Sequence, residues 1–167
     1  LPHGMMSVAP FNVMGGGKGN IDKDSRWWST PYEHSNHFFT GFSHGNLSGV
    51  GCPDMGALLI CPSGGALTPD YNAYGSTHTA ESASTGYYST LLIKDSILCE
   101  ATATLRTARE RFTFHKGSEA HIYLNLGEAL SNERGASIRR TAENEWEGSR
   151  LLGGFCYNEA AVFPIYF

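Results

Sequence analysis

The stretch ILCEATATLR, residues 97 to 106, alternates small or apolar side chains with mainly polar ones. On an extended chain, one set of alternate residues falls on a single side: Ile97, Cys99, Ala101, Ala103 and Leu105. Successive side chains of a β-strand point to opposite faces of a sheet, so a period of two is typical of a half-buried strand. The stretch therefore predicts a strand with these five residues facing the core.

The segments that follow extend the same pattern. ERFTFH (110–115) predicts a second strand, residues 116–118 predict a turn, and HIYLNLG (121–127) predicts a strand that returns beside the second. Short loops that contain glycine favour hairpins over crossover helices, so the three strands are predicted to form an antiparallel meander. Phe112 and Phe114 share one face of the second strand, and the third strand is predicted to turn Ile122, Leu124 and Leu126 inward.

The rest of the chain repeats this organisation. ALLICP (57–62) predicts an apolar strand ended by a proline, and GYYSTLLI (86–93), SIRRTA (137–142) and AAVFPIYF (160–167) predict others. Helical periodicity is scarce, and glycine, serine, threonine and asparagine interrupt the chain at short intervals. About eight strands without a linker or an internal repeat predict one all-β domain over residues 1–167, a two-sheet antiparallel β-sandwich.

Composition narrows the range of partners. The 167 residues are 41% hydrophobic and carry a formal net charge of −4, which suits one globular domain with a real core. Lysine and arginine are scattered rather than gathered in a stripe, which argues against nucleic acid and against anionic membranes as partners. No apolar run approaches the roughly 20 residues needed to span a bilayer.

The four cysteines are widely spaced and form no C-x-x-C pair: Cys52, Cys61, Cys99 and Cys156. This spacing excludes a zinc ribbon and a thioredoxin motif, and it favours small buried thiols over disulfides. The apolar run AVFPIYF (161–167) at the last position of the chain is unlike the polar ends of most domains, which predicts that the chain is a fragment.

Two groups of residues near the N-terminus raise the question of a binding site. His34 and His37 stand three apart, but Pro31 disfavours a helix there, so surface or packing roles are preferred to metal binding. Aromatic residues gather just before position 43: Trp27, Trp28, Tyr32, Phe38, Phe39 and Phe42. Such rings offer a platform for sugar rings, although the two indoles could equally close one end of the core.

A longer motif identifies a family resemblance. FSHGNLSGVGCPDMG (42–56) closely resembles the F-S-H-x-H-L-S-G-x-G-C-x-D-x-G signature of the N-terminal domain of glycoside hydrolase family 92, the calcium-dependent exo-α-mannosidases. LPHGMMSVAP (1–10) is similar to the family's V-P-F-G-M segment. The run at 83–114 is similar to its P-G-Y-Y-S-V and I-x-x-E-x-T-A-T-x-R segments. The resemblance covers nearly the whole chain, in the right order.

The resemblance implies a β-sandwich that packs on a larger (α/α)6 catalytic domain absent from this chain, which is truncated at both ends. In the family that second domain supplies the acid glutamate, the base aspartates and most Ca²⁺ ligands, so no catalytic or metal-binding residue is expected here. The implied enzyme hydrolyses terminal α-mannosides of N-glycans or mannans by inversion, in the periplasm or outside the cell. Its partners are its own catalytic domain and a mannose-containing oligosaccharide.

The same resemblance suggests which residues meet the substrate. Trp27 or Trp28 occupies the region from which a tryptophan of the family contacts the neighbouring sugar. His44, Asn46 and Asp54 are expected to line a rim that faces the catalytic domain. Asn46 replaces the second histidine of the family signature, which leaves the linkage specificity open. Two other hypotheses remain: a self-sufficient carbohydrate-binding module, and a purely structural domain that stabilises its catalytic partner.

Overall fold

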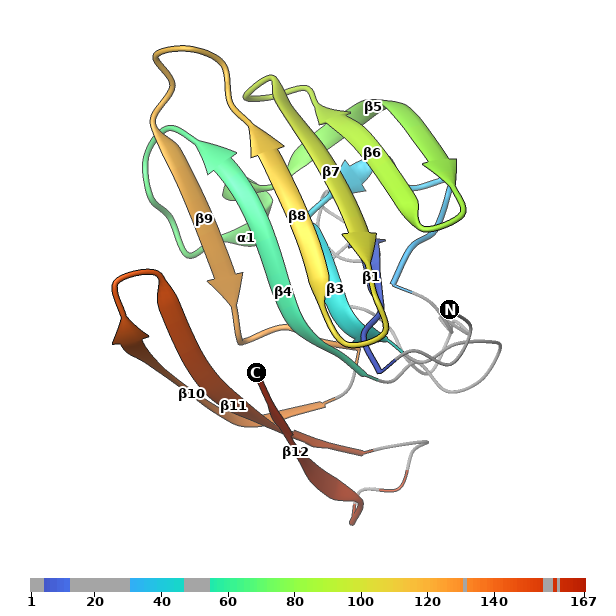
Figure 1. Ribbon diagram of the computed structural model, residues 1–167, viewed down its shortest axis with the longest axis vertical. Helices are drawn as coiled ribbons and strands as arrows, with labels where there is room; N and C mark the ends of the chain where they lie inside the picture. The colour runs from blue at the N-terminus through green and yellow to red at the C-terminus, as the bar shows by residue number, and fades with distance from the viewer. Residues whose placement is uncertain (1–4, 13–30, 47–54, 131, 155–157, 159) are drawn as a thin grey trace.

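The computed structural model describes residues 5–12, 31–46, 55–130, 132–154, 158 and 160–167 (Figure 1). In chain order the elements are β1 (Val8–Phe11), β2 (Phe38–Phe39), β3 (Gly41–Asn46), β4 (Met55–Gly64), α1 (Tyr71–Tyr74), β5 (Ser76–Ser84), β6 (Tyr87–Leu92), β7 (Ile97–Ala103), β8 (Ala108–Thr113), β9 (Ala120–Asn125), β10 (Asn132–Ala142), β11 (Glu145–Gly153) and β12 (Val162–Tyr166). The helix α1 has four residues, and the described part of the chain holds no helix long and apolar enough to cross a membrane.

The strands form three antiparallel sheets (Figure 1). The four-stranded sheet has the order β1-β3-β4-β9, the five-stranded sheet has the order β2-β5-β6-β7-β8, and the third sheet has the order β10-β11-β12. Phe42 of β3 packs on rings from the five-stranded sheet, with centroid distances of 6.1 Å to Phe112 of β8 and 6.0 Å to Tyr88 of β6. The predicted all-β sandwich of two antiparallel sheets is therefore confirmed. The third sheet was not predicted.

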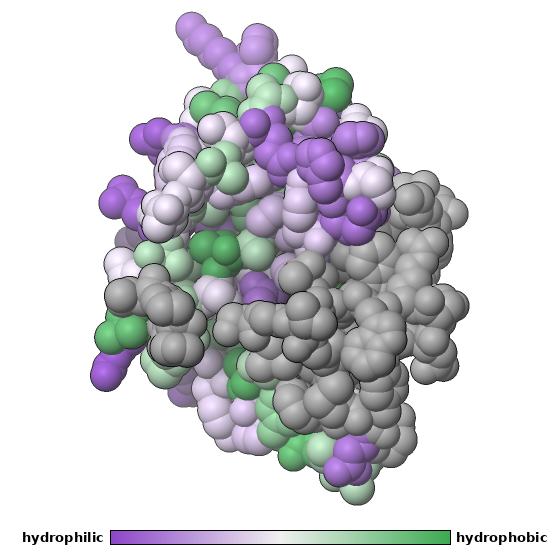
Figure 2. All heavy atoms as spheres, turned by 90° about the vertical axis from the view of Figure 1, so that its right-hand side faces the viewer, coloured by the Kyte–Doolittle hydropathy of each residue, from purple (hydrophilic) through white to green (hydrophobic). Residues whose placement is uncertain are grey.

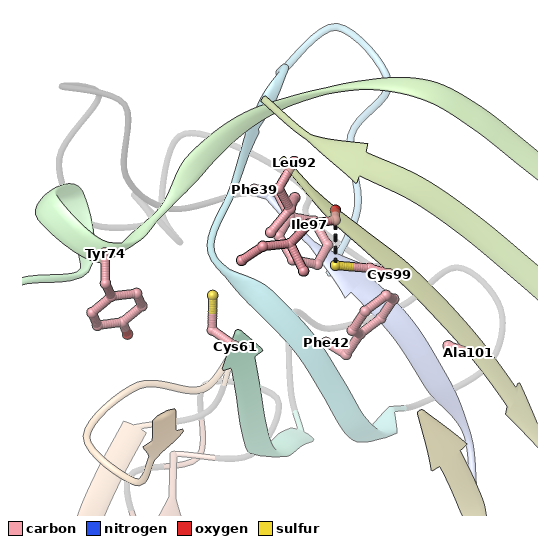
Figure 3. Close-up of a cluster of buried hydrophobic side chains, with 8 residues drawn as sticks. All are labelled: Phe39, Phe42, Cys61, Tyr74, Leu92, Ile97, Cys99 and Ala101. Atoms are coloured by element: carbon pink, nitrogen blue, oxygen red, sulfur yellow. Dashed lines mark hydrogen bonds between the residues drawn. The ribbon is translucent and has the colours of Figure 1, made fainter. Parts of the chain in front are cut away.

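The main core lies between and around these two sheets (Figure 3). Its fully buried members come from β2, β3, β4, α1, β6 and β7: Phe39, Phe42, Cys61, Tyr74, Leu92, Ile97, Cys99 and Ala101. Cys61 and Cys99 are free thiols, which confirms the prediction for these two, and burial raises the pKa of both. A buried thiol that stays protonated behaves as a small hydrophobe. Cys52 and Cys156 lie outside the described residues.

The strand predicted at residues 97–106 is confirmed over most of its length, because β7 spans Ile97–Ala103. Three of the five residues predicted to face the core are buried, namely Ile97, Cys99 and Ala101. Leu105, however, lies beyond the end of β7 and is 47% exposed. The chain turns there, because the backbone N–H of Thr104 donates to the carbonyl of Thr107, 2.8 Å away, on the way into β8. The alternation of side chains in the sequence therefore continues to Arg106, although β7 ends at Ala103.

The predicted meander is wrong at its third strand. β8 pairs with β7 as expected, but β9 pairs with β4, so residues 114–119 cross from one sheet to the other. The predicted inward face of β9 is also wrong, since Ile122 is 51% exposed and Leu124 is 39% exposed. Instead Tyr123 packs on the core, stacked on Tyr74 of α1 with a centroid distance of 4.4 Å.

The sequence predicted that Pro62 ends its strand, and this prediction is wrong. β4 continues to Gly64, and Pro62 pairs with Ile122 of β9. The ladder between β3 and β4 stops at Ile60, so Pro62 has a strand neighbour on one side only. Proline lacks a backbone N–H and so cannot donate a hydrogen bond to a neighbouring strand. A position that is paired on one side only tolerates this best.

The third sheet is fastened to the sandwich by one arginine and a small apolar cluster. Arg150 of β11 is fully buried, and its Nη1 donates to the carbonyls of Ala57 at 2.6 Å and Glu128 at 2.8 Å. Burial lowers the pKa of this guanidinium, against the attraction of nearby glutamates. Beside it, Leu152 packs with Ala57 and Ala129. The strands expected at 137–142 and 160–167 thus exist, but they belong to this separate sheet together with β11.

Candidate functional site

Two of the five predicted substrate-binding residues lie in the described part of the chain. His44 and Asn46 are on β3, at the start of the glycine-rich stretch. Trp27, Trp28 and Asp54 lie outside the described residues, so their roles stay predictions. The stretch itself does connect two strands, because β3 ends at Asn46, β4 begins at Met55, and the two are paired antiparallel.

His44 lies in the space between the two sheets of the sandwich. Its side chain is 8% exposed, and its Nε2 is 3.2 Å from Oε1 of Glu110, which is 7% exposed and belongs to β8 of the opposite sheet. Its Nδ1 is 3.0 Å from the carbonyl oxygen of Leu58 on the neighbouring strand. Both ring nitrogens therefore face oxygen acceptors, an arrangement that suits a doubly protonated imidazolium.

The electrostatics of this pair follow from its position. Burial opposes a charged imidazole, but Glu110 and the Leu58 carbonyl outweigh it and raise the pKa of His44 above its ordinary value. Burial raises the pKa of Glu110, while the attraction of His44 opposes that shift. A buried pair of this kind links β3 to β8 across the sandwich. Removing one partner strongly destabilises the fold, because the other charge then stays buried without a partner.

A pH dependence of stability follows from the raised pKa of His44. The group binds its proton more tightly in the folded chain, so its contribution is fully present below the unfolded histidine pKa of about 6.5 and is lost as pH rises through the higher folded value. We expect the free energy of unfolding, measured by urea titration from pH 6 to 9, to fall over this window. His44→Gln and Glu110→Gln should both flatten the fall, and an undiminished slope in both variants would contradict the assignment.

Asn46 is braced by its neighbours in β3 and by the segment before β1. Its Oδ1 accepts from Ser43 Oγ at 2.9 Å, and its Nδ2 donates to the Ser43 carbonyl at 3.0 Å. Its backbone N–H donates to Ser7 Oγ at 2.7 Å. Asn46 is only partly buried, so it lies at a surface while its amide is held in one orientation. Its predicted role at the rim that faces the catalytic domain stays a prediction.

A polar aromatic cluster that sequence reasoning missed joins Tyr32 to side chains of β5 and β6 on the described surface. Both oxygens of Glu81 on β5 accept from tyrosine hydroxyls, Oε1 from Tyr88 at 2.6 Å and Oε2 from Tyr32 at 2.8 Å. The Tyr32 hydroxyl also lies 3.0 Å from Nδ1 of His34, an exposed side chain. Tyr32 was noted among the aromatic residues, but nothing in the sequence links it to Glu81.

The protonation states of this cluster limit its chemistry. Partial burial works against the carboxylate, but the hydroxyls of Tyr88 and Tyr32 hold the pKa of Glu81 below its usual range. Burial and Glu81 raise the pKa of Tyr32 to about 12, and the same two causes raise the pKa of Tyr88. An ionised carboxylate with both oxygens occupied is a poor general acid, whereas phenol rings with fixed hydroxyls suit hydrogen bonding and stacking.

The other aromatic residues proposed for a sugar platform are divided by their burial. Phe39 and Phe42 are fully buried in the core, with ring centroids 5.1 Å apart, so they present no surface to a ligand. Phe38 is partly buried on the short strand β2. Among the members of that group with described positions, only Tyr32 belongs to a polar cluster at the surface. Among the described residues, no three His, Cys, Asp or Glu side chains form a set that could hold a metal ion.

The family model described as the glycosyl hydrolase family 92 N-terminal domain matches residues 1–167. A comparison with curated proteins found no match.

Three solved structures share the fold. The family GH92 α-mannosidase BT3965 from Bacteroides thetaiotaomicron has a TM-score of 0.79 and 24% identity, and the match covers 90% of this chain and 20% of that one. The GH92 family glycosyl hydrolase ccman5 has a TM-score of 0.77 and 24% identity, covering 99% of this chain and 22% of that one. The GH92 inverting mannosidase BT2199 from Bacteroides thetaiotaomicron VPI-5482 has a TM-score of 0.64 and 17% identity, covering 90% and 18%.

Proposed function

Because this chain belongs to the N-terminal domain family of glycosyl hydrolase family 92, we propose that it forms one wall of the substrate cleft of an α-mannosidase. The match of the family model to residues 1–167 carries the proposal. The chain spans about a fifth of the length of the solved relatives, 20% of BT3965 and 22% of ccman5. The reaction is therefore proposed for a longer protein, of which these residues are one part.

The proposed enzyme hydrolyses terminal α-mannosides of N-glycans or mannans in the periplasm or outside the cell. One of the structural relatives is described as an inverting mannosidase, which supports inversion here. Inversion uses one carboxylic acid to protonate the leaving oxygen and one carboxylate to activate water on the opposite face of the sugar. The acid, the base and Ca²⁺ are assigned to the catalytic domain, and the described residues offer no set of side chains that fits the ion.

This domain is proposed to hold the leaving-group side of the substrate. Trp27 or Trp28 would stack on the neighbouring sugar. The cluster of Tyr32, Glu81 and Tyr88 would add fixed hydrogen-bonding groups, and Tyr32 follows Trp28 by four positions in the chain. His44, Asn46 and Asp54 belong to the same proposal, as rim residues that face the catalytic domain.

A purely structural role is the second candidate, and particular contacts favour it. Both ring nitrogens of His44 face protein oxygens, and the amide of Asn46 is bonded to Ser43 through both of its polar atoms. If the domain only stabilises its partner, substitutions at these positions will change stability but not substrate binding. If instead the chain is a self-sufficient carbohydrate-binding module, mannobiose will bind to it alone at millimolar concentration or below.

The function is tested by release of mannose. The full-length enzyme with Ca²⁺ is expected to release mannose from α-mannosides, while the 167-residue chain alone is expected to release none. Release by the chain alone would refute the assignment of the reaction to the catalytic domain. A full-length protein inactive on every α-mannoside would refute the proposed function itself.

Trp28→Ala in the full-length enzyme tests the contact with the neighbouring sugar. Loss of one stacked ring is expected to reduce kcat/KM for an α-mannobioside about fivefold to thirtyfold, given a stacking energy of about 1–2 kcal/mol. Trp146→Ala is a matched control, because Trp146 is 52% exposed on the third sheet. Steady-state kinetics unchanged by Trp28→Ala, with Trp27→Ala equally silent, would remove the tryptophan pair from the cleft.

A further inference from the structure

One side of the four-stranded sheet is covered over only part of its width. Partners across an antiparallel ladder share a face, so Phe42 of β3, Ile60 of β4 and Leu124 of β9 lie in one row on one face. Exposure rises along this row, from 0% at Phe42 to 39% at Leu124. The next row of the same face pairs Pro62 with Ile122, which is 51% exposed.

The cause is the position of β8, the edge strand of the five-stranded sheet. β8 lies against β3, as the 6.1 Å stack of Phe112 on Phe42 and the 3.2 Å ion pair of Glu110 with His44 show. Among the described residues no strand of that sheet follows β8. In the view of Figure 1, β4 and then β9 lie to the left of β8, and no described element is drawn in front of them. The apolar face of the four-stranded sheet is therefore covered by β8 at β3 and left uncovered by the described residues at β4 and β9.

The opposite face of the same strands is already occupied. Tyr123 stacks on Tyr74, Asn125 donates to the Tyr74 hydroxyl at 2.8 Å, and Leu59 is 1% exposed. β9 thus carries the aliphatic Ile122 and Leu124 on its exposed face, while Tyr123 and Asn125 on its other face contact α1. By contrast, the side of the molecule seen in Figure 2 carries apolar residues scattered among polar ones.

We propose that the face formed by Leu58, Ile60, Ile122 and Leu124, named here the β4–β9 face, is the surface on which the remainder of the family 92 polypeptide docks. This inference rests on the proposed function. The relatives are about five times longer than the chain, since it covers 20% of BT3965 and 22% of ccman5, so a large tethered partner is implied. A tethered partner binds at high effective concentration and needs no strong charge complementarity.

The chemistry of the face fits this occupant better than a sugar. Its four side chains are aliphatic, with no aromatic ring to stack on a pyranose and no polar group to bond a hydroxyl. Aliphatic surface left in contact with water loses the stabilisation that burial would give, and it promotes association. Burial against another protein surface removes both costs.

Side-chain labelling of the full-length enzyme by hydroxyl radicals tests the proposal without any substitution. Leu124 on the β4–β9 face and Leu98 on the outer face of the five-stranded sheet are both 39% exposed in this domain, so they form a matched pair. We expect Leu124 to be labelled about fivefold more slowly than Leu98, because docking removes its contact with water. Equal labelling of the two leucines would overturn the proposal.

A pair of substitutions in the full-length enzyme gives a second measurement. Leu124→Glu buries an unpaired charge if the face is docked, so it should lower the unfolding midpoint by about 4 °C or more beyond the effect of Leu98→Glu. Equal midpoints for the two variants would again overturn it. Protection of Leu124 that appears only where the wild-type enzyme dimerises would assign the face to a second copy instead.

These outcomes are separable from failure of the proposed function. A full-length enzyme that shows slow labelling of Leu124 but releases no mannose keeps the docking surface and refutes the mannosidase assignment. An active enzyme in which Leu124 and Leu98 are labelled alike keeps the function and refutes the docking surface.

Discussion

Phe42→Ala is expected to reduce the free energy of unfolding of the chain by about 3–5 kcal/mol, the usual cost of truncating a buried phenylalanine. Phe42 has no exposed surface, and its ring centroid is 5.1 Å from that of Phe39, 6.0 Å from Tyr88 and 6.1 Å from Phe112. Because these neighbours lie on three different strands of the five-stranded sheet, β2, β6 and β8, while Phe42 itself lies on β3 of the other sheet, they cannot all move to fill the space. The loss is a large part of the 5–15 kcal/mol that stabilises a typical domain.

Urea titration followed by circular dichroism measures this cost. Phe42→Leu is the control, since it keeps most of the buried volume and is expected to cost about 1–2 kcal/mol. If Phe42→Ala cost no more than Phe42→Leu, the core between β3 and β8 would have to be far more compliant than the packed rings indicate.

Gly41→Ala is expected to have a comparable effect, about 3 kcal/mol or more, although it adds only a methyl group. Gly41 has a φ of +148°, a region that side chains rarely adopt. A Cβ there would lie 2.8 Å from the backbone oxygen of Ile60 and 3.3 Å from Cγ of Leu59. The nearest atom belongs to the backbone of the paired strand, so relief requires a shift of β4 itself.

Gly45→Ala separates the two causes. Gly45 also has positive φ, +67°, but a Cβ there would meet no atom within 4 Å. Only the conformational cost of about 1–2 kcal/mol should therefore appear. Equal losses of stability in the two variants, measured by the same urea titration, would show that the contact with Ile60 is relieved at no cost.

The alternation of side chains predicted the positions of several strands, but it was less reliable in predicting which strand faces are buried. Ile97, Cys99 and Ala101 are buried as predicted, because β7 lies between β6 and β8 in its sheet and its inner face is covered. The same pattern in β9 placed Ile122 and Leu124 in a core, and they are exposed. Periodicity records which side chains share a face, and it carries no information about whether a second sheet reaches that face.

The candidate site shows the same division. The signature residue His44 was singled out from the sequence, but its partner Glu110 is far away in the chain and belongs to the other sheet. The cluster of Tyr32, Glu81 and Tyr88 likewise joins residues separated by 49 and 7 positions, and no local motif announces it. Pairings of this kind depend on how the strands are ordered in the sheets.

By itself, the sequence determined that this chain is an all-β domain, where most of its strands lie and which family it resembles, because strand periodicity, turn residues and the signature at 42–56 are local patterns. Only the tertiary structure decided that β9 crosses to the four-stranded sheet, that β10, β11 and β12 form a sheet of their own, and that β8 stops short of β4. Those outcomes depend on long-range strand pairing and on which apolar faces meet, and neither is encoded in any single stretch of the chain.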